Sequence, residues 1–567
     1  MFCSPRRTLA AVLLAAFLQF QPAQFTLAED TKTSASPPEL AAADQLYRAG
    51  KFAEAEAGYR SALKADSKLV LAQVGLVRSL LRQQKIDEAF DEVNTALVVT
   101  PNSAPLLAAK GDVQFRRAEM SDAELSYLAA KKLDHKEVYA YLGLARLYSS
   151  YSMYRVAYGE LLFAHEIAPD DVELQRAWLA MLPRKERVAA LEAYLNGPHP
   201  DNEKETTRMT EYLEFLKATV DKPLHACRVV SKMEQTETKL ETIYAEKGGR
   251  SRYMNAPQGV GLPVSLNEEN FQLLLDTGAG GIVVSSRVAE KAKFIRLSAV
   301  HFGGIGDQGL RGGYRAVADH IRIGELEFQD CLVTVTDQRA VGGGDGLIGA
   351  DVFGDYLIDI DLPRMRLRLS PLPRRPEDTM VPQSLNSEGE EEANAEQKEG
   401  RQIETTSSSK DQKSSAHTSE TPRRLPKDRY VAPEMVKWTK VFRLSHMMLV
   451  PTSVNGSKPM LFLLDTGAFS NILSLRAGRQ VTKVGSDYID RVSGLNGKVA
   501  EVYSSKKATL SFGHLRQSNL GITTLDLSSM SGLTGTEVSG FLGFEMLKRL
   551  ELKLDYRDGM VDFVYRP

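Results

Sequence analysis

One short apolar segment occurs twice in the C-terminal half of the chain. Residues 271–279 read Phe-Gln-Leu-Leu-Leu-Asp-Thr-Gly-Ala, and residues 460–468 read Met-Leu-Phe-Leu-Leu-Asp-Thr-Gly-Ala. Each copy has the pattern of a buried strand, and each is followed later by an apolar-apolar-Gly element, at residues 347–349 and 541–543. A single Asp-Thr-Gly is more often a turn than a catalyst, because Asp and Gly are common turn residues. Two copies with the same flanking elements are far more specific and predict two related β-rich halves.

These two segments resemble aspartic proteases of the retropepsin and pepsin group, over about residues 224–373 and 430–567. In that family each half of a two-fold site supplies one Asp-Thr-Gly loop. The resemblance therefore implies two all-β barrel domains of the acid-protease type, with Asp276 and Asp465 as the catalytic residues. It also implies that the loops are supported by Thr277, Gly278, Thr466 and Gly467.

The proposed chemistry explains why two copies are needed. Two carboxylates held ~3 Å apart cannot both ionise cheaply, so they share a proton. The ionised group acts as a general base on water, and the protonated group donates to the peptide carbonyl. This reaction requires neither a cofactor nor a metal, and the 9 His are scattered without the spacing of a zinc site.

The two copies differ after the shared motif. The first continues as Gly-Gly-Ile at residues 280–282, and the second as Phe-Ser-Asn at residues 469–471. The first copy therefore lacks a polar side chain at the position of Asn471, and we expect its loop to be more mobile. Glycine-bearing segments at residues 303–306 and 494–497 are predicted hairpin tips over the substrate.

The N-terminal half has a different repeat. Alanine recurs every 34 residues at two positions: Ala55, Ala89, Ala123 and Ala157, and Ala62, Ala96, Ala130 and Ala164. This period resembles the tetratricopeptide repeat, in four units over about residues 36–171, with residues 172–223 as a helical cap or degenerate repeat. The resemblance implies an all-α solenoid whose concave surface binds a protein or peptide. An array that only holds the rest of the chain, or dimerises it, is an equally weighted alternative.

The N-terminus is predicted to be an export signal over residues 1–28. Arg6 and Arg7 precede an apolar stretch from Leu9 to Phe20, which is too short to span a bilayer. An uncleaved anchor is the alternative, and no later segment is long and apolar enough to cross a membrane. We expect a periplasmic or extracellular protein without a membrane span after signal removal. Export permits a disulfide between Cys227 and Cys331, with two free, buried thiols the somewhat favoured alternative.

Composition limits the partners. Lys plus Arg total 71 and Asp plus Glu total 73, so the formal net charge of −2 gives no case for a nucleic-acid binder. Residues 374–429 are rich in Glu, Ser, Thr, Lys and Gln and predict a disordered linker. Such a linker would let the two halves pair within a monomer or across a homodimer.

The sequence thus predicts a multidomain chain, in which a helical solenoid precedes two β-barrel halves. The leading hypothesis is an exported aspartic endopeptidase that cleaves a protein or peptide substrate, with the repeats docking substrate or partner. The alternative is a non-catalytic interaction scaffold in which the protease-like halves are structural. The separation of the Asp276 and Asp465 carboxylates distinguishes the two hypotheses.

Overall fold

A computed structural model describes most of the chain beyond the first 37 residues. The described residues are 38–199, 201, 203–220, 228–231, 234–244, 257–304, 311–336, 344–376, 427–485, 492–494, 497–519 and 521–566. The predicted signal, most of the predicted linker and Cys227 lie outside these residues, as do residues 305–306 and 495–496 of the two predicted hairpin tips.

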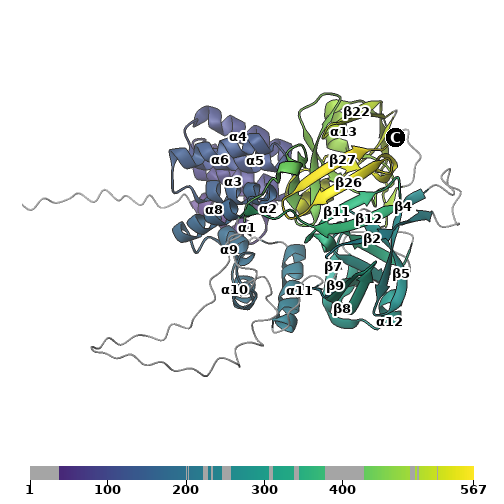
Figure 1. Ribbon diagram of the computed structural model, residues 1–567. Helices are drawn as coiled ribbons and strands as arrows, with labels where there is room; N and C mark the ends of the chain where they lie inside the picture. The colour runs from purple at the N-terminus through teal and green to yellow at the C-terminus, as the bar shows by residue number, and fades with distance from the viewer. Residues whose placement is uncertain are drawn as a thin grey trace, which may run out of the picture.

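The N-terminal half is a succession of helices that pack one against the next (Figure 1). The repeated alanines are buried at the helix contacts. Tyrosines fill the space beside glycines: a Cβ on Gly75 would lie 2.4 Å from the ring of Tyr59, and one on Gly111 would lie 2.5 Å from the ring of Tyr127. The helices are α1 (Pro38–Arg48), α2 (Phe52–Ala65), α3 (Val70–Arg82), α4 (Ile86–Val99), α5 (Ala104–Arg116), α6 (Met120–Leu133), α7 (Val138–Ser150), α8 (Tyr154–Ile167), α9 (Val172–Leu179), α10 (Arg184–Asn196) and α11 (Glu203–Thr219).

The C-terminal half consists of two strand-rich units. The first contains β1 (Arg228–Val229), β3 (Glu241–Tyr244), β4 (Pro257–Leu266), β5 (Glu269–Asp276), β6 (Ile282–Ser285), α12 (Ser286–Lys291), β7 (Ile295–Phe302), β8 (Arg311–Ile323), β9 (Leu326–Thr336), β10 (Gly346–Gly349) and a 3₁₀ turn, η1 (Ala350–Phe353). The second contains β14 (Phe442–Leu444), β15 (Met447–Val454), β16 (Met460–Leu464), β17 (Ile472–Ser474), α13 (Leu475–Val481), β18 (Val484–Gly485), β19 (Ser493–Gly494), β20 (Gly497–Lys498), β21 (Tyr503–Ser505), β22 (Ala508–Phe512), β23 (Leu515–Asn519), β24 (Ile522–Leu525), α14 (Ser528–Thr534), β25 (Gly540–Leu542) and α15 (Phe544–Leu547).

The two units repeat one strand topology. In the first, β10 pairs in parallel with β5 and antiparallel with β6, and β6 pairs in parallel with β9. In the second, β25 pairs in parallel with β16 and antiparallel with β17, and β17 pairs in parallel with β24. The parallel pairs place each apolar-apolar-Gly strand beside the strand that ends at Asp-Thr-Gly. The predicted fold class, a helical solenoid followed by two β domains, is confirmed.

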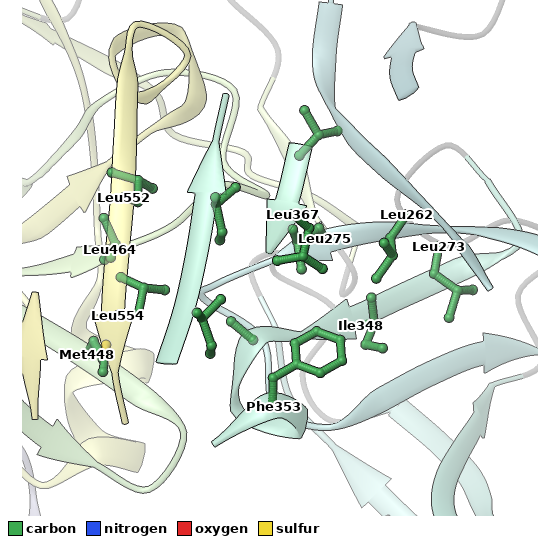
Figure 2. Close-up of a cluster of buried hydrophobic side chains, with 14 of the residues drawn as sticks. Leu262, Leu273, Leu275, Ile348, Phe353, Leu367, Met448, Leu464, Leu552 and Leu554 are labelled. Carbon is green, nitrogen blue, oxygen red and sulfur yellow. The ribbon is translucent and has the colours of Figure 1, made fainter. Parts of the chain in front are cut away.

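A further sheet joins the two units within one chain. Its strands run in the order β13 (Thr439–Lys440), β27 (Met560–Tyr565), β26 (Leu550–Asp555), β11 (Tyr356–Asp361), β12 (Arg366–Pro371) and β2 (Thr236–Lys239). Strand β11 of the first unit pairs antiparallel with β26 of the second, with Ile358 opposite Leu554. Figure 2 shows the buried core that continues across this junction, from Leu275 and Phe353 to Leu464. The two halves are therefore paired within the chain.

The helical array packs directly on the second unit, a contact that the sequence did not predict. Phe115, at the end of α5, is 1% exposed and shares an apolar cluster with Leu461 and Phe541. The backbone carbonyl of Phe115 accepts a hydrogen bond from the hydroxyl of Thr536, and the carbonyl of Arg116 accepts one from the Glu537 N–H at 3.0 Å. The array and this unit consequently share one hydrophobic core.

Helix α11 contacts the first unit at strand β7. The Glu211 carboxylate accepts a hydrogen bond from the His301 backbone N–H at 2.9 Å and contacts the His301 ring. The guanidinium of Arg315 lies 4.8 Å from the ring centroid of Phe215. The helical region therefore contacts both β units, and it does so beside the β7–β8 hairpin in the first.

Both ends of the predicted linker contact folded parts of the chain, one in the second strand-rich unit and one in the helical array. Arg375 is buried and pairs with Asp558, and Asp428 accepts a hydrogen bond from the Arg155 N–H at 2.9 Å. Cys331 is disulfide-bonded, which contradicts the expectation of a free thiol at this position. Within the described ranges, no helix combines the length and apolar character needed to cross a membrane.

Candidate active site

Two buried strands deliver the Asp-Thr-Gly loops. Strand β5 has buried leucines on both faces and ends at Asp276, and β16 is buried in the same way just before Asp465. Such continuous apolar runs suit strands that are covered on both sides. Each loop is closed by a glycine at the C-terminal end of the paired strand: the Gly349 N–H donates to the Gly281 carbonyl at 2.7 Å, and the Gly543 N–H donates to Oδ1 of Asn471 at 2.9 Å.

The two loops are joined by a symmetric set of hydrogen bonds. Oγ1 of Thr466 accepts from the Thr277 N–H at 3.0 Å and donates to the Leu275 carbonyl at 2.7 Å. Oγ1 of Thr277 accepts from the Thr466 N–H at 3.0 Å and donates to the Leu464 carbonyl at 2.8 Å. Both threonines are fully buried, so their hydroxyls are the hydrogen-bond partners of backbone groups that water cannot reach.

The two carboxyl groups lie together between the loops and hydrogen-bond to each other. Each lies against the glycine of the opposite loop: a Cβ on Gly278 would be 2.6 Å from Cγ of Asp465, and a Cβ on Gly467 would be 2.4 Å from Cγ of Asp276. Glycine is therefore required at both positions for the carboxyls to approach. The structure brings all six predicted site residues into one place.

Backbone N–H groups orient the carboxylates. The Gly278 N–H donates to Oδ1 of Asp276 at 2.8 Å, and Oδ1 of Asp465 accepts from the N–H groups of Gly467 at 2.9 Å and Ala468 at 2.8 Å. Such bonds to an anion are short and strong. Each carboxylate thus has one oxygen fixed by its own loop and one that can face the opposite carboxyl group.

Burial raises the pKa of Asp276 and raises the pKa of Asp465 well above its ordinary value of 3.8. The negative charge of Asp276 is the second cause of the shift at Asp465. Two nearby carboxyls in a dry site favour a state with one shared proton. The pair can therefore supply an acid and a base at the same time.

The raised pKa of Asp465 predicts a pH-dependent stability difference for Asp465→Asn. An acid whose pKa is raised on folding holds more protons in the native state, so stability falls as pH rises from about 4 towards the raised pKa. The uncharged amide has no such penalty, and each unit of raised pKa corresponds to about 1.4 kcal/mol. Thermal unfolding of both proteins between pH 4 and pH 7 should show the variant gaining stability relative to wild type as pH rises. A constant difference across that range would contradict the assignment.

Thr466→Val is expected to destabilise the paired loops. The substitution keeps the shape of the side chain but leaves the Thr277 N–H and the Leu275 carbonyl without the partners described above. Each buried backbone group left unpaired costs about 1–3 kcal/mol. Denaturant unfolding measures the loss. Thr509→Val is the matched control, because that hydroxyl makes an exposed contact with Ser518; an equal effect at both positions would argue against a joint between the loops.

The first loop receives support that the sequence did not predict. The Asp351 carboxylate accepts from the Gly281 N–H of the loop at 2.9 Å and 3.2 Å, whereas in the second copy Asn471 of the loop accepts from the Gly543 N–H. Asp351 lies two residues after the glycine of the apolar-apolar-Gly element, and this fixed offset was the available signal. His446 also contacts this loop, but its place in the sequence gave no indication of that contact.

Comparisons with known proteins agree with this architecture. Residues 262–355 match the family model described as "gag-polyprotein putative aspartyl protease", and residues 450–546 match one described as "Aspartyl protease". None of the curated proteins searched matches the chain.

Solved structures similar to the chain include two tetratricopeptide repeat proteins. One, from Parabacteroides merdae, has 18% identity and a TM-score of 0.23, and the match covers 33% of this chain and 75% of that chain. The other, a thermophilic protein from Thermus thermophilus, has 19% identity and a TM-score of 0.25, with 31% and 97% covered. At these scores the repeat assignment depends on the 34-residue period and the helix packing described above. The chain carries two aspartyl protease domains in its C-terminal half, and a region of helical repeats precedes them in the sequence.

Proposed function

We propose that the chain is an aspartic endopeptidase with one composite site, made by Asp276 and Asp465. The observation that carries the proposal is the hydrogen-bonded pair of carboxyls between two interlocked Asp-Thr-Gly loops. A scaffold without catalysis would have no need for two buried acids with raised pKa values, which cost stability at neutral pH. Close approach of the carboxyls favours catalysis over the scaffold alternative.

In the proposed reaction, the ionised carboxylate takes a proton from a water molecule as the water oxygen bonds to the peptide carbonyl carbon. The protonated carboxyl donates its proton to the carbonyl oxygen, so the tetrahedral intermediate forms without a buried, unpaired oxyanion. Collapse of the intermediate transfers a proton to the leaving nitrogen and breaks the C–N bond. The products are a carboxylic acid and an amine, and the pair regains its single shared proton.

The helical region is proposed to act as a fixed part of the enzyme that presents substrate or a partner to the site. Its contacts with both domains support this role: α5 meets the loop around Thr536 and Glu537, and α11 meets His301 of the β7–β8 hairpin. An array attached in this way can hold a bound protein in a constant position relative to the carboxyls. We also propose export from the cytoplasm, on the basis of the signal-like pattern of residues 1–28.

A proteome-derived peptide library tests the proposed activity. Wild-type protein is expected to produce new peptide termini at acidic to neutral pH, and a mimic of the tetrahedral intermediate is expected to stop their production. The Asp465→Asn variant, prepared in the same way, reports any contaminating protease. A library left intact by folded wild-type protein across this pH range would contradict the proposal and favour the scaffold.

A further inference from the structure

His446 belongs to the second domain but contacts the catalytic loop of the first. It lies in the turn between β14 and β15, and Nδ1 of its ring would be 2.6 Å from a Cβ on Gly280. Its Cγ and Cε1 would be 2.8 Å and 3.0 Å from the same Cβ. The His446 ring thus covers the loop at Gly280. Any side chain at position 280 would displace the ring.

The His446 ring also makes polar contacts around the loop. It lies close enough to the backbone of Gly278, two residues after Asp276, to interact with it. It interacts electrostatically with Asp351 and Asp276, in that order of strength. Because Asp351 accepts from the Gly281 N–H, the loop is covered at Gly280 by His446 and held at Gly281 by Asp351.

The second loop is supported differently. Phe469 stands at the position equivalent to Gly280, and Asn471 supplies Oδ1 to the Gly543 N–H from within the loop itself. The first loop has glycine and isoleucine at these two positions. Gly280 therefore leaves room for a side chain from the opposite domain, which compensates for support that the first loop lacks in its own sequence.

We propose that His446 is a positioning residue, which fixes the loop that carries Asp276 from the opposite domain. The inference deepens the proposed protease function and rests on it. Its consequence is that the geometry of Asp276 depends on the docking of the two domains, through a contact separate from the threonine bonds. A loop displaced by a fraction of an ångström lowers the rate of the chemical step far more than it weakens substrate binding.

The charged groups around His446 come from both domains. Asp276 and Asp351 face it from the first domain. In the second domain, Arg443 on β14 donates to the Tyr556 carbonyl, and the Tyr556 side chain is buried near Asp351 and Asp276. Burial lowers the pKa of His446 below its ordinary value of 6.5, so the ring that covers the loop is neutral at neutral pH. Protonation at lower pH would place a positive charge beside the two carboxylates.

A double-mutant cycle of Gly280→Ala and His446→Ala tests the proposal. Each single variant is expected to lower kcat about 10- to 100-fold with little change in KM, because each disturbs the same loop. In the His446→Ala background, Gly280→Ala should cause almost no further loss, because the ring that its methyl group strikes is gone. Losses in kcat that multiply in the double variant would overturn the proposal.

His446→Gln separates the contact from the charge. The planar, polar amide can cover the loop at Gly280 as the ring does but cannot take up a proton, so it should restore most of the kcat at neutral pH and change the acidic limb of the pH profile. A Gln variant as impaired as the Ala variant, with an unchanged pH profile, would contradict a positioning role. Gly159→Ala and His514→Gln are matched controls, since a Cβ on Gly159 meets nothing within 4 Å and His514 is exposed.

Thermal unfolding of the four proteins of the cycle distinguishes failure of this inference from failure of the proposed function. Coupling in unfolding temperature without coupling in kcat would show a packing contact only, and would overturn the positioning role. If wild-type protein proves inactive, the proposed function fails. Absence of coupling in the unfolding temperatures would then refute the His446 contact as well.

Discussion

The substitutions Asp276→Asn and Asp465→Asn are each expected to reduce kcat for peptide cleavage by about 10²–10⁴-fold or more, with KM nearly unchanged. Each Asp is one half of a single acid–base pair, and loss of general acid–base work alone costs a factor of this size. An amide at either position accepts a hydrogen bond but cannot exchange a proton with water. The double variant should be no worse than either single one, because groups that act as a unit are not additive.

Steady-state kinetics on a peptide identified from the library provides this measurement, with Asp319→Asn as the matched control. Asp319 is an exposed aspartate on β8 of the first domain. Full activity in Asp276→Asn with complete loss in Asp465→Asn would contradict a shared site. Cleavage that persists in both variants would show that the activity belongs to another part of the chain or to a contaminant.

Phe115→Ala is expected to lower the free energy of unfolding by about 3–5 kcal/mol, as large-to-small substitutions of buried phenylalanine do. Phe115 is 1% exposed and belongs to the cluster shared by the array and the second aspartyl protease domain. The array and this domain should still unfold in a single transition, at a lower denaturant concentration. The cavity left by Phe115 weakens the core that both parts share. Denaturant unfolding followed in parallel by far-ultraviolet circular dichroism and by peptide cleavage makes the measurement.

Leu125→Ala is the matched control for Phe115. It also removes a large apolar side chain from the array, but Leu125 is 67% exposed and its loss should change stability by less than about 0.5 kcal/mol. If Phe115→Ala unfolds the array first and leaves cleavage unchanged, the array is an independent module and the shared core is wrong. An equal, small effect of both substitutions would lead to the same conclusion.

Much of the fold was predictable because its signals are local and repeated. The alanines at 34-residue intervals indicate helices packed at close range, and the two Asp-Thr-Gly copies indicate two equivalent strand ends. Threonine at positions 277 and 466 could be assigned to the site through the family resemblance. The structure adds why both are needed, since each hydroxyl supplies a donor and an acceptor to the opposite loop.

The contacts between the parts were not predictable, because nothing in a local pattern specifies them. Phe115 has the periodicity of any core residue of a helix, and only the assembled structure shows that it reaches the second protease domain. His446 is similar: it lies about 170 residues from Asp276 along the chain, in a turn without a motif. The sequence does show that the first copy has glycine at position 280 where the second copy has Phe469, but it does not show which side chain fills the space.

The central claim is that one chain forms one site from Asp276 and Asp465, and mixing two inactive variants tests it most directly. Asp276→Asn and Asp465→Asn proteins are unfolded together, refolded and assayed for peptide cleavage. Domains paired within each chain leave every site with one Asn, so the mixture should remain as inactive as its components. Recovery of about a quarter to a half of the activity of an equal amount of refolded wild-type protein would mean that the domains pair between chains, and would contradict the claim.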